Sequence, residues 1–219
     1  GTFQAVVTFA DGADIITASK GTDNVRLGEG AGDSIASGGD RNITIGKNAG
    51  TAITTGSRNV GIGHQSLLVN TVGSRSVAVG HNSLSTQNPA SATDMYNTAV
   101  GHEAGAAITI GTENTIVGAL AGDAVTDGNG NVIMGYEAGS SATTTDHSVL
   151  IGYQAAGSGT MTGHDNTFIG MRAGKDCTSG QRNVAVGRET MNAITTGEGN
   201  IAIGNDSAYR LTTGDNNIA

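Results

Sequence analysis

The sequence predicts an all-β fold, a parallel β-solenoid of about eleven coils with about 17 residues in each coil. The first observation behind this prediction is a short segment, Asn97 to Gly105, that recurs along the chain. The second is its spacing, because the aligned copies place a glycine every 17 or 18 residues, with one step of 21. A twelfth copy opens at Asn217. The aligned glycines are Gly28, Gly46, Gly63, Gly80, Gly101, Gly118, Gly135, Gly152, Gly170, Gly187 and Gly204.

Each copy contains one short predicted strand between glycine corners. Val, Ile or Thr follows the opening residue, and an apolar residue stands two positions later, as in Val184 and Val186. β-Branched residues at a spacing of two are typical of one face of a strand. Glycine suits the corners because it adopts positive φ without a steric cost. Each coil is therefore expected to be a strand, a glycine corner, a second short segment and another glycine corner.

The opening position of the repeat is Asn in ten of twelve copies, with Ser76 and Ser148 in the other two. Stacked Asn side chains can hydrogen-bond to each other and to the backbone of the turn along the stack. We predict a continuous asparagine ladder along one corner of the solenoid. A separate Asn-rich turn in each copy is an alternative that gives the same fold.

The residue between the two β-branched positions is expected to point out of the coil. Most of this column is apolar, and its middle carries large side chains. A strand that is apolar on both faces is buried on both faces, and a slender coil cannot cover its own outer side. Another chain is therefore expected to cover this stripe. Its members are Ile116, Ile133, Leu150 and Phe168.

The chain divides into residues 1–23, an N-terminal cap or connector, and residues 24–219, the repeat domain. Phe3, Val7 and Phe9 lie at alternate positions of a predicted bulkier strand that could cover the first coil or connect to an upstream domain. Because the chain starts at Gly1 rather than Met and stops within a repeat, we expect a segment of a longer polypeptide.

The 21-residue step holds the segment from Gln87 to Tyr96, with the only proline of the chain. An insertion into a narrow coil is expected to bulge outward. If the protein touches a receptor, this loop is the predicted contact, through Pro89, Met95 and Tyr96. A loop without a role is the alternative.

The composition excludes several classes of function. The chain has 36 glycines, 3% aromatic residues and a net charge of -8, with no basic run, which argues against binding to nucleic acid. No apolar stretch is long enough to span a membrane, so no membrane insertion is expected. The lone Cys177 stands where other copies carry Ile or Leu and is expected to be a buried thiol.

No catalytic, metal or cofactor site is predicted. His64, His81 and His102 follow the repeated glycine in three consecutive copies and should stack, an arrangement that suits metal ligands. The same column also accepts Lys47, Tyr136 and other unrelated residues, so a solvated column is the preferred interpretation. The acidic residues are scattered, so no enzyme is expected. Broken threonine columns leave ice binding as a minor alternative.

The repeats resemble a known family. Asn97 to Ala104 and Asn200 to Ser207 resemble the Asn-x-Val-Ala-Ile-Gly-x-x-Ser/Ala repeat of YadA-like heads in trimeric autotransporter adhesins. The longer form with a Thr-Thr-Gly connector, as in Asn183 to Gly197, is similar to repeats in tail fibres of bacteriophages. The resemblance implies a left-handed parallel β-roll, assembly into a homotrimer and a role in surface attachment. The four residues of the outward stripe then become the predicted trimer interface around a three-fold axis.

Two functions follow as expectations from this resemblance. The first is a structural or host-attachment segment of a bacteriophage tail fibre, part of the virion, whose partners are two identical chains, other fibre or virion proteins and a glycan or protein of the host surface. The alternative is the head domain of a bacterial trimeric adhesin at the bacterial cell surface.

Overall fold

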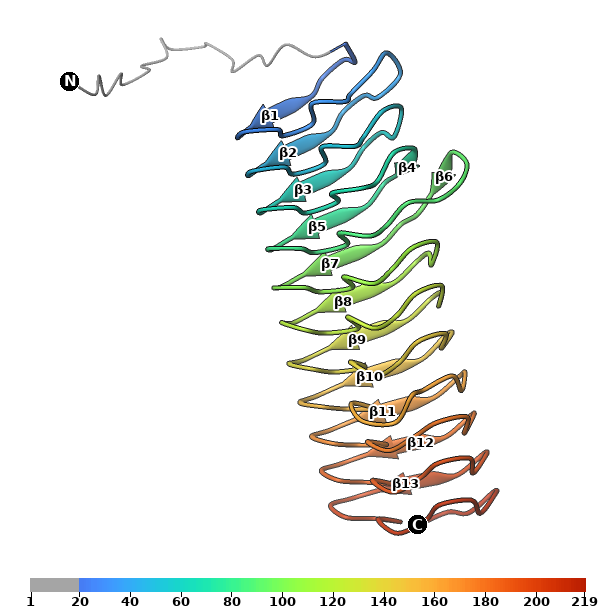
Figure 1. Cartoon of the computed structure of the whole chain (residues 1–219). Helices are drawn as coiled ribbons and strands as arrows, with labels where there is room; N and C mark the ends of the chain where they lie inside the picture. The colour runs from blue at the N-terminus through green and yellow to red at the C-terminus, as the bar shows by residue number, and fades with distance from the viewer. Residues whose placement is uncertain (1–19) are drawn as a thin grey trace, which may run out of the picture.

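The computed structural model describes residues 20–219; residues 1–19, which make up most of the predicted N-terminal cap or connector, lie outside the described residues. The predicted β-solenoid is confirmed. The described part of the chain contains strands and no helix, and its coils stack into one elongated column (Figure 1). No candidate for a membrane-crossing helix occurs between residues 20 and 219.

Eleven of the strands form a single parallel sheet that runs the length of the column. In sheet order they are β1 (Val25–Leu27), β2 (Ile43–Ile45), β3 (Val60–Ile62), β5 (Val77–Val79), β7 (Thr98–Val100), β8 (Thr115–Val117), β9 (Val132–Met134), β10 (Val149–Ile151), β11 (Thr167–Ile169), β12 (Val184–Val186) and β13 (Ile201–Ile203). A small second sheet pairs β4 (Gly73–Ser74) with β6 (Thr93–Asp94) in parallel.

The register of the long sheet follows the repeat. Leu150 of β10 pairs with Phe168 of β11 and with Ile133 of β9, so that equal positions of successive copies lie side by side. The inserted residues between β5 and β7 do not shift this register, because Ala78 pairs with Ala99. Every position of the repeat therefore becomes a column of side chains along the solenoid.

The repeated glycine at the end of each strand is required for two reasons. At Gly135 the backbone has φ 131°, a left-handed conformation that side chains other than glycine rarely adopt. A Cβ atom there would also lie 2.7 Å from the carbonyl oxygen of Gly152 in the next coil. The column of glycines thus lets neighbouring coils approach closely at this corner.

The predicted asparagine ladder is confirmed over most of the chain. The amide Nδ2 of Asn114 donates to Oδ1 of Asn97 at 3.2 Å and to the carbonyl of Gly128 at 2.8 Å. Its own Oδ1 accepts from the backbone N–H of Asn131 at 3.0 Å and from the Asn131 amide at 3.0 Å. Each buried Asn side chain therefore joins its own turn to the neighbouring coil. Where Ser148 replaces Asn, its hydroxyl accepts from the backbone N–H of Asn166.

At the long coil, the inserted segment completes the ladder. Ser76 stands at the Asn position and does not bond directly to Asn97. Gln87 is fully buried, and its Oε1 accepts from Oγ of Ser76 at 3.1 Å and from Nδ2 of Asn97 at 3.0 Å. The insertion thus supplies one amide oxygen at the point where the repeat lacks one. Nε2 of Gln87 and Oδ1 of Asn70 have no hydrogen-bond partner, although both atoms are buried.

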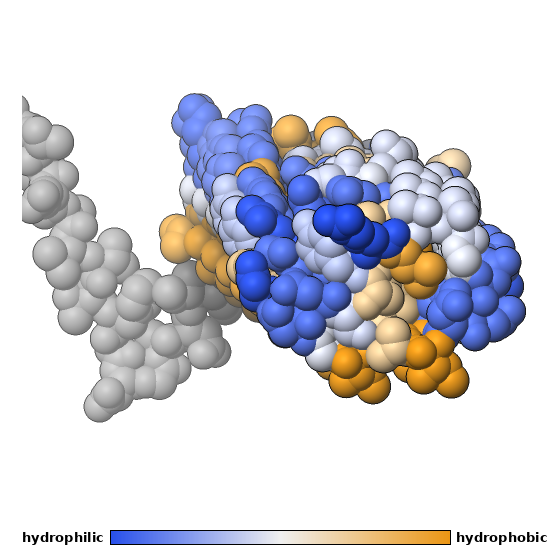
Figure 2. Space-filling view, turned by 90° about the horizontal axis from the view of Figure 1, so that it is seen from below, coloured by the Kyte–Doolittle hydropathy of each residue, from blue (hydrophilic) through white to orange (hydrophobic). Residues whose placement is uncertain are grey.

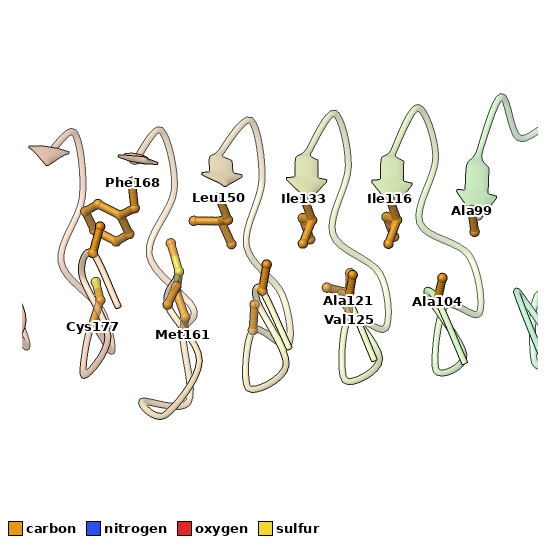
Figure 3. Close-up of a cluster of buried hydrophobic side chains, with 14 of the residues drawn as sticks. Ala99, Ala104, Ile116, Ala121, Val125, Ile133, Leu150, Met161, Phe168 and Cys177 are labelled. Carbon is orange, nitrogen blue, oxygen red and sulfur yellow. The ribbon is translucent and has the colours of Figure 1, made fainter. Parts of the chain in front are cut away.

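The predicted direction of the strand side chains is wrong. The middle residue of every strand in the long sheet except β1 is buried, while its two neighbours are partly or fully exposed. Figure 3 shows the middle side chains pointing into the coil, toward Ala121, Val125, Met161 and Cys177 on the opposite wall. The predicted trimer interface is therefore corrected, because its four members fill the interior of a single chain with no exposed area; they are Ile116, Ile133, Leu150 and Phe168.

The physical reason is the volume of the coil. The middle residue shares the interior with the position four residues after the repeated glycine, and in most coils a large residue at one position accompanies a small residue at the other. Phe168 faces Gly174, where a Cβ would collide with its ring, whereas Gly61 is followed by Leu67. Complementary volumes of this kind allow the side chains of these coils to pack closely in a narrow interior.

Candidate functional site

The outer face of the long sheet is a continuous apolar surface. It consists of the first and third residues of each of the eleven strands, and we call it the outer face. None of these residues is fully buried, none is charged, and only three are Thr. The first positions are Val25, Ile43, Val60, Val77, Thr98, Thr115, Val132, Val149, Thr167, Val184 and Ile201, and the third positions are Leu27, Ile45, Ile62, Val79, Val100, Val117, Met134, Ile151, Ile169, Val186 and Ile203.

The outer face extends along the whole sheet. Eleven strands about 4.8 Å apart, each with three residues of about 3.3 Å, give an area on the order of 500 Å². Several side chains on it are well exposed, among them Leu27 and Ile203 at 65% each and Met134 at 38%. Viewed from the C-terminal end, hydrophobic residues reach the surface in separate groups between hydrophilic ones (Figure 2). The largest apolar patch of a monomeric protein is typically about 300–600 Å² and is often functional, so the outer face is a candidate interaction surface.

Sequence reasoning missed the outer face because both sides of the strand are apolar. Two signals in the sequence could have identified it. The middle column varies from Gly61 to Phe168, and its extremes are matched by opposite sizes in a second column, as expected for residues that share a confined volume. The first and third columns hold only Val, Ile, Leu, Met and Thr, which gives a uniform surface from coil to coil.

The predicted receptor-contact loop protrudes, but two of its three residues do not face solvent. The loop that carries β6 extends beyond the turns of its neighbours (Figure 1). Pro89 and Met95 are buried, and both lie close to Gly73 of β4. The assignment of these two residues to a contact surface is therefore corrected, since each closes the base of the loop. Tyr96 is 50% exposed.

Tyr96 belongs to a small polar cluster on the surface of this loop. The guanidinium of Arg75 lies 5.6 Å from the centre of the Tyr96 ring and 2.8 Å from Oδ1 of Asp94. The hydroxyl of Tyr96 donates to Oδ2 of Asp94 at 3.3 Å. These contacts hold the tyrosine ring in place and leave half of its surface open to solvent.

The histidine column is stacked as the period predicts. The ring centres of His64 and His81 are 5.2 Å apart, and those of His81 and His102 are 5.0 Å apart. All three side chains are exposed. Further along the same column, the rings of Tyr136 and Tyr153 stack at 5.8 Å. Aromatic rings thus line part of the edge beside the outer face.

Burial shifts the pKa of two titratable groups of this chain, Cys177 and Asp123. Burial raises the pKa of the Cys177 thiol to about 12, so the group stays protonated and packs in the core, as predicted. Partial burial raises the pKa of Asp123, and the carboxylates of Glu103 and Glu137 add to this effect. The carboxylates of Glu103, Asp123 and Glu137 therefore lie in one region of the surface.

Comparison of the chain with family models, with curated proteins and with solved structures finds no match of any of the three kinds.

Proposed function

We propose that this chain is a structural, host-attachment segment of a bacteriophage tail fibre, in which three copies of a left-handed parallel β-roll pack into a rigid shaft. The observation that carries the proposal is the outer face, an uncharged apolar surface that continues through all eleven strands. A solenoid exposed to water along this length would place about 500 Å² of apolar surface in solvent.

The shape of the outer face favours identical chains as its cover. Each strand contributes two side chains, apolar in all but three cases, and the parallel register repeats them at a fixed spacing along the column. A second copy of the chain presents the same spacing, so its side chains can interdigitate over the full length of the face. In a closed three-fold arrangement each chain contacts two others, and no apolar edge is left for open-ended growth.

The resemblance of the repeats to fibre and adhesin sequences supports a role in attachment. A rigid trimer would present each surface feature three times, and weak contacts multiplied in this way gain avidity. We assign the receptor-contacting role to the exposed tip of the Gln87–Tyr96 loop. Pro89 and Met95 shape the base of the loop. The exposed residues are Asn88, Ala90, Ser91, Ala92, Asp94 and Tyr96.

Removal of four residues, 90 to 93, would test this assignment, because it restores the regular 17-residue spacing at the long coil. The variant keeps Gln87 and Met95, which the ladder and the interior need. Adsorption of the assembled fibre to its host cells should fall by at least about tenfold, as expected when three contacts are lost together. Unchanged adsorption with intact assembly would assign this segment to the shaft alone. The matched control is Tyr136→Ala, which removes an exposed ring on the edge column.

The head of a bacterial trimeric adhesin is the second candidate, favoured by the Asn97 to Ala104 form of the repeat. Both candidates use the same trimer, so the parent gene distinguishes them. A tail-attachment domain in the same open reading frame would support the fibre. A signal peptide together with an outer-membrane anchor would support the adhesin instead.

A further inference from the structure

We propose that His81, His102 and Glu103 form an intrachain binding site for a first-row divalent transition metal ion, with Zn²⁺ as the reference ion. The inference does not depend on the proposed function. The coils bring these three side chains together although His81 and His102 are 21 residues apart. One ligand atom from each side chain lies within 4.8 Å of those of the other two.

The chemistry of the three side chains matches such an ion. Two imidazoles and one carboxylate supply nitrogen and oxygen ligands of the kind that Zn²⁺ binds at about 2.0–2.2 Å. Donors on one ion lie about 3.4 Å apart in tetrahedral geometry, so they must approach by up to about 1.4 Å. Nε2 of His102 is already 3.9 Å from Oε1 of Glu103. All three side chains are accessible, so rotation of the side chains can close the remaining distances between their ligand atoms.

The backbone fixes the relative positions of the three residues. The N–H of Glu103 donates to the carbonyl oxygen of His81 at 2.8 Å, which ties the two coils together directly beneath the side chains. Glu103 has φ 55°, a left-handed backbone that belongs to this corner in every coil. The ligands therefore need only side-chain rotation to bind an ion, which lowers the entropic cost of binding.

The local charge also favours a cation. In the described part of the chain, Glu103 forms no ion pair with a Lys or Arg, and its only charged contact is His102. Asp123 lies near enough to both Glu103 and Glu137 to interact with each of them electrostatically. A divalent ion would reduce the repulsion among these carboxylates.

The repeat provides a built-in comparison for the site. The equivalent residues one coil earlier are His64, His81 and Asn82, which offer two stacked imidazoles but an amide in place of the carboxylate. In the other coils this position has at most one histidine. The site lies across the long coil, where Gln87 bridges the asparagine ladder, so a bound ion would cross-link the two ends of that coil.

The test is isothermal titration of Zn²⁺ into the full chain after treatment with a chelator. We expect saturable binding of one ion per chain, and no binding of Mg²⁺, which prefers oxygen ligands. His81→Ala, His102→Ala and Glu103→Gln should each weaken Zn²⁺ binding by at least about tenfold. His64→Ala, the matched control, should change affinity by less than about threefold. The absence of saturable binding, or an equal loss in the His64 variant, would overturn the proposal.

Thermal unfolding gives a second and independent readout. Saturating Zn²⁺ should raise the unfolding temperature of the wild-type chain, and a chelator should reverse the shift, since an ion that binds only the folded state stabilises it. The His102→Ala variant should fold normally, because the side chain is exposed, and should show no shift. A shift of equal size in this variant, or a stoichiometry of one ion per three chains, would contradict an intrachain site.

Discussion

The two sides of the same eleven strands are both largely apolar but meet different environments. On the inner side, single residues range from Gly61 to Phe168, and the largest and smallest of them are compensated by the facing positions Gly174 and Leu67. On the outer side, the side chains stay uniform in size and shape from β1 to β13. The inner side is packed within one chain. The outer side is built as one repeating surface, which suits contact with another repeating surface.

The largest expected difference between the two sides is the response to a buried charge. Ile133→Asp places a carboxylate in the interior with no partner, and we expect a loss of at least about 4 kcal/mol in the free energy of unfolding. The adjacent Met134→Asp lies on the outer face and should leave the chain folded. Denaturant unfolding followed by circular dichroism would measure both. Equal loss of structure in the two variants would show that inner and outer sides are not distinct.

The asparagine ladder allows the same comparison at the corner of the coil. Asn114→Ala removes the bonds to Asn97 and Gly128 and leaves the backbone N–H of Asn131 without a partner, so unfolding should become easier by about 3 kcal/mol. The neighbouring Glu113→Ala is exposed and should cost less than about 0.5 kcal/mol. Hydrogen exchange at Asn131 offers a direct measurement, because this amide should lose protection in the first variant only.

The complementary volumes of the inner side predict a coupling between two positions. Ala78→Ile should overpack the coil against Leu84 and cost about 2 kcal/mol. Addition of Leu84→Gly recreates the pair found at Ile116 and Gly122, so the double variant should be more stable than the sum of the single changes by about 1–3 kcal/mol. Val77→Ile on the outer side is the control and should show no such coupling. Additive effects of Ala78→Ile and Leu84→Gly would contradict the volume argument.

The smallest expected effect concerns the residue before the asparagine position, which adopts a left-handed backbone on the outside of the corner. Arg58 has φ 60°, and Gly130 occupies the same column with φ 66°. Arg58→Gly should stabilise the chain by up to about 1 kcal/mol, because glycine adopts this backbone without strain. The reverse change, Gly130→Ala, should destabilise it by a similar amount. Thermal unfolding of both variants would measure the difference.

The sequence predicted the period, the parallel stacking and the asparagine ladder because each depends on equal residues recurring at equal spacing. It did not predict which side of the strand is inside. Alternation shows which residues share a face, but the inside can be identified only when one face is polar. Here Ile133 and Met134 are both apolar. The inner face can be identified only from opposite sizes at two positions of the same coil, such as Phe168 and Gly174.

The long coil was predicted less well, since no other copy carries an insertion for comparison. A polar residue such as Gln87 is ordinarily expected at the surface. Gln87 is buried because its amide oxygen replaces the one that the ladder lacks at Ser76. The loop must fold back into the coil to place it there, and the sequence does not show that path. The period did predict that His81 and His102 would stack. The approach of Glu103 to His81 depends on the corner that follows the glycine.

The central claim is that copies of this chain cover the outer face, and the mass of the folded protein in solution tests it most directly. Sedimentation equilibrium of the full chain should give three times the chain mass of 21.7 kDa. Val149→Asp, in the middle of the outer face, should give folded single chains. A folded wild-type protein that sediments as a single chain, with its outer face in water, would contradict the account.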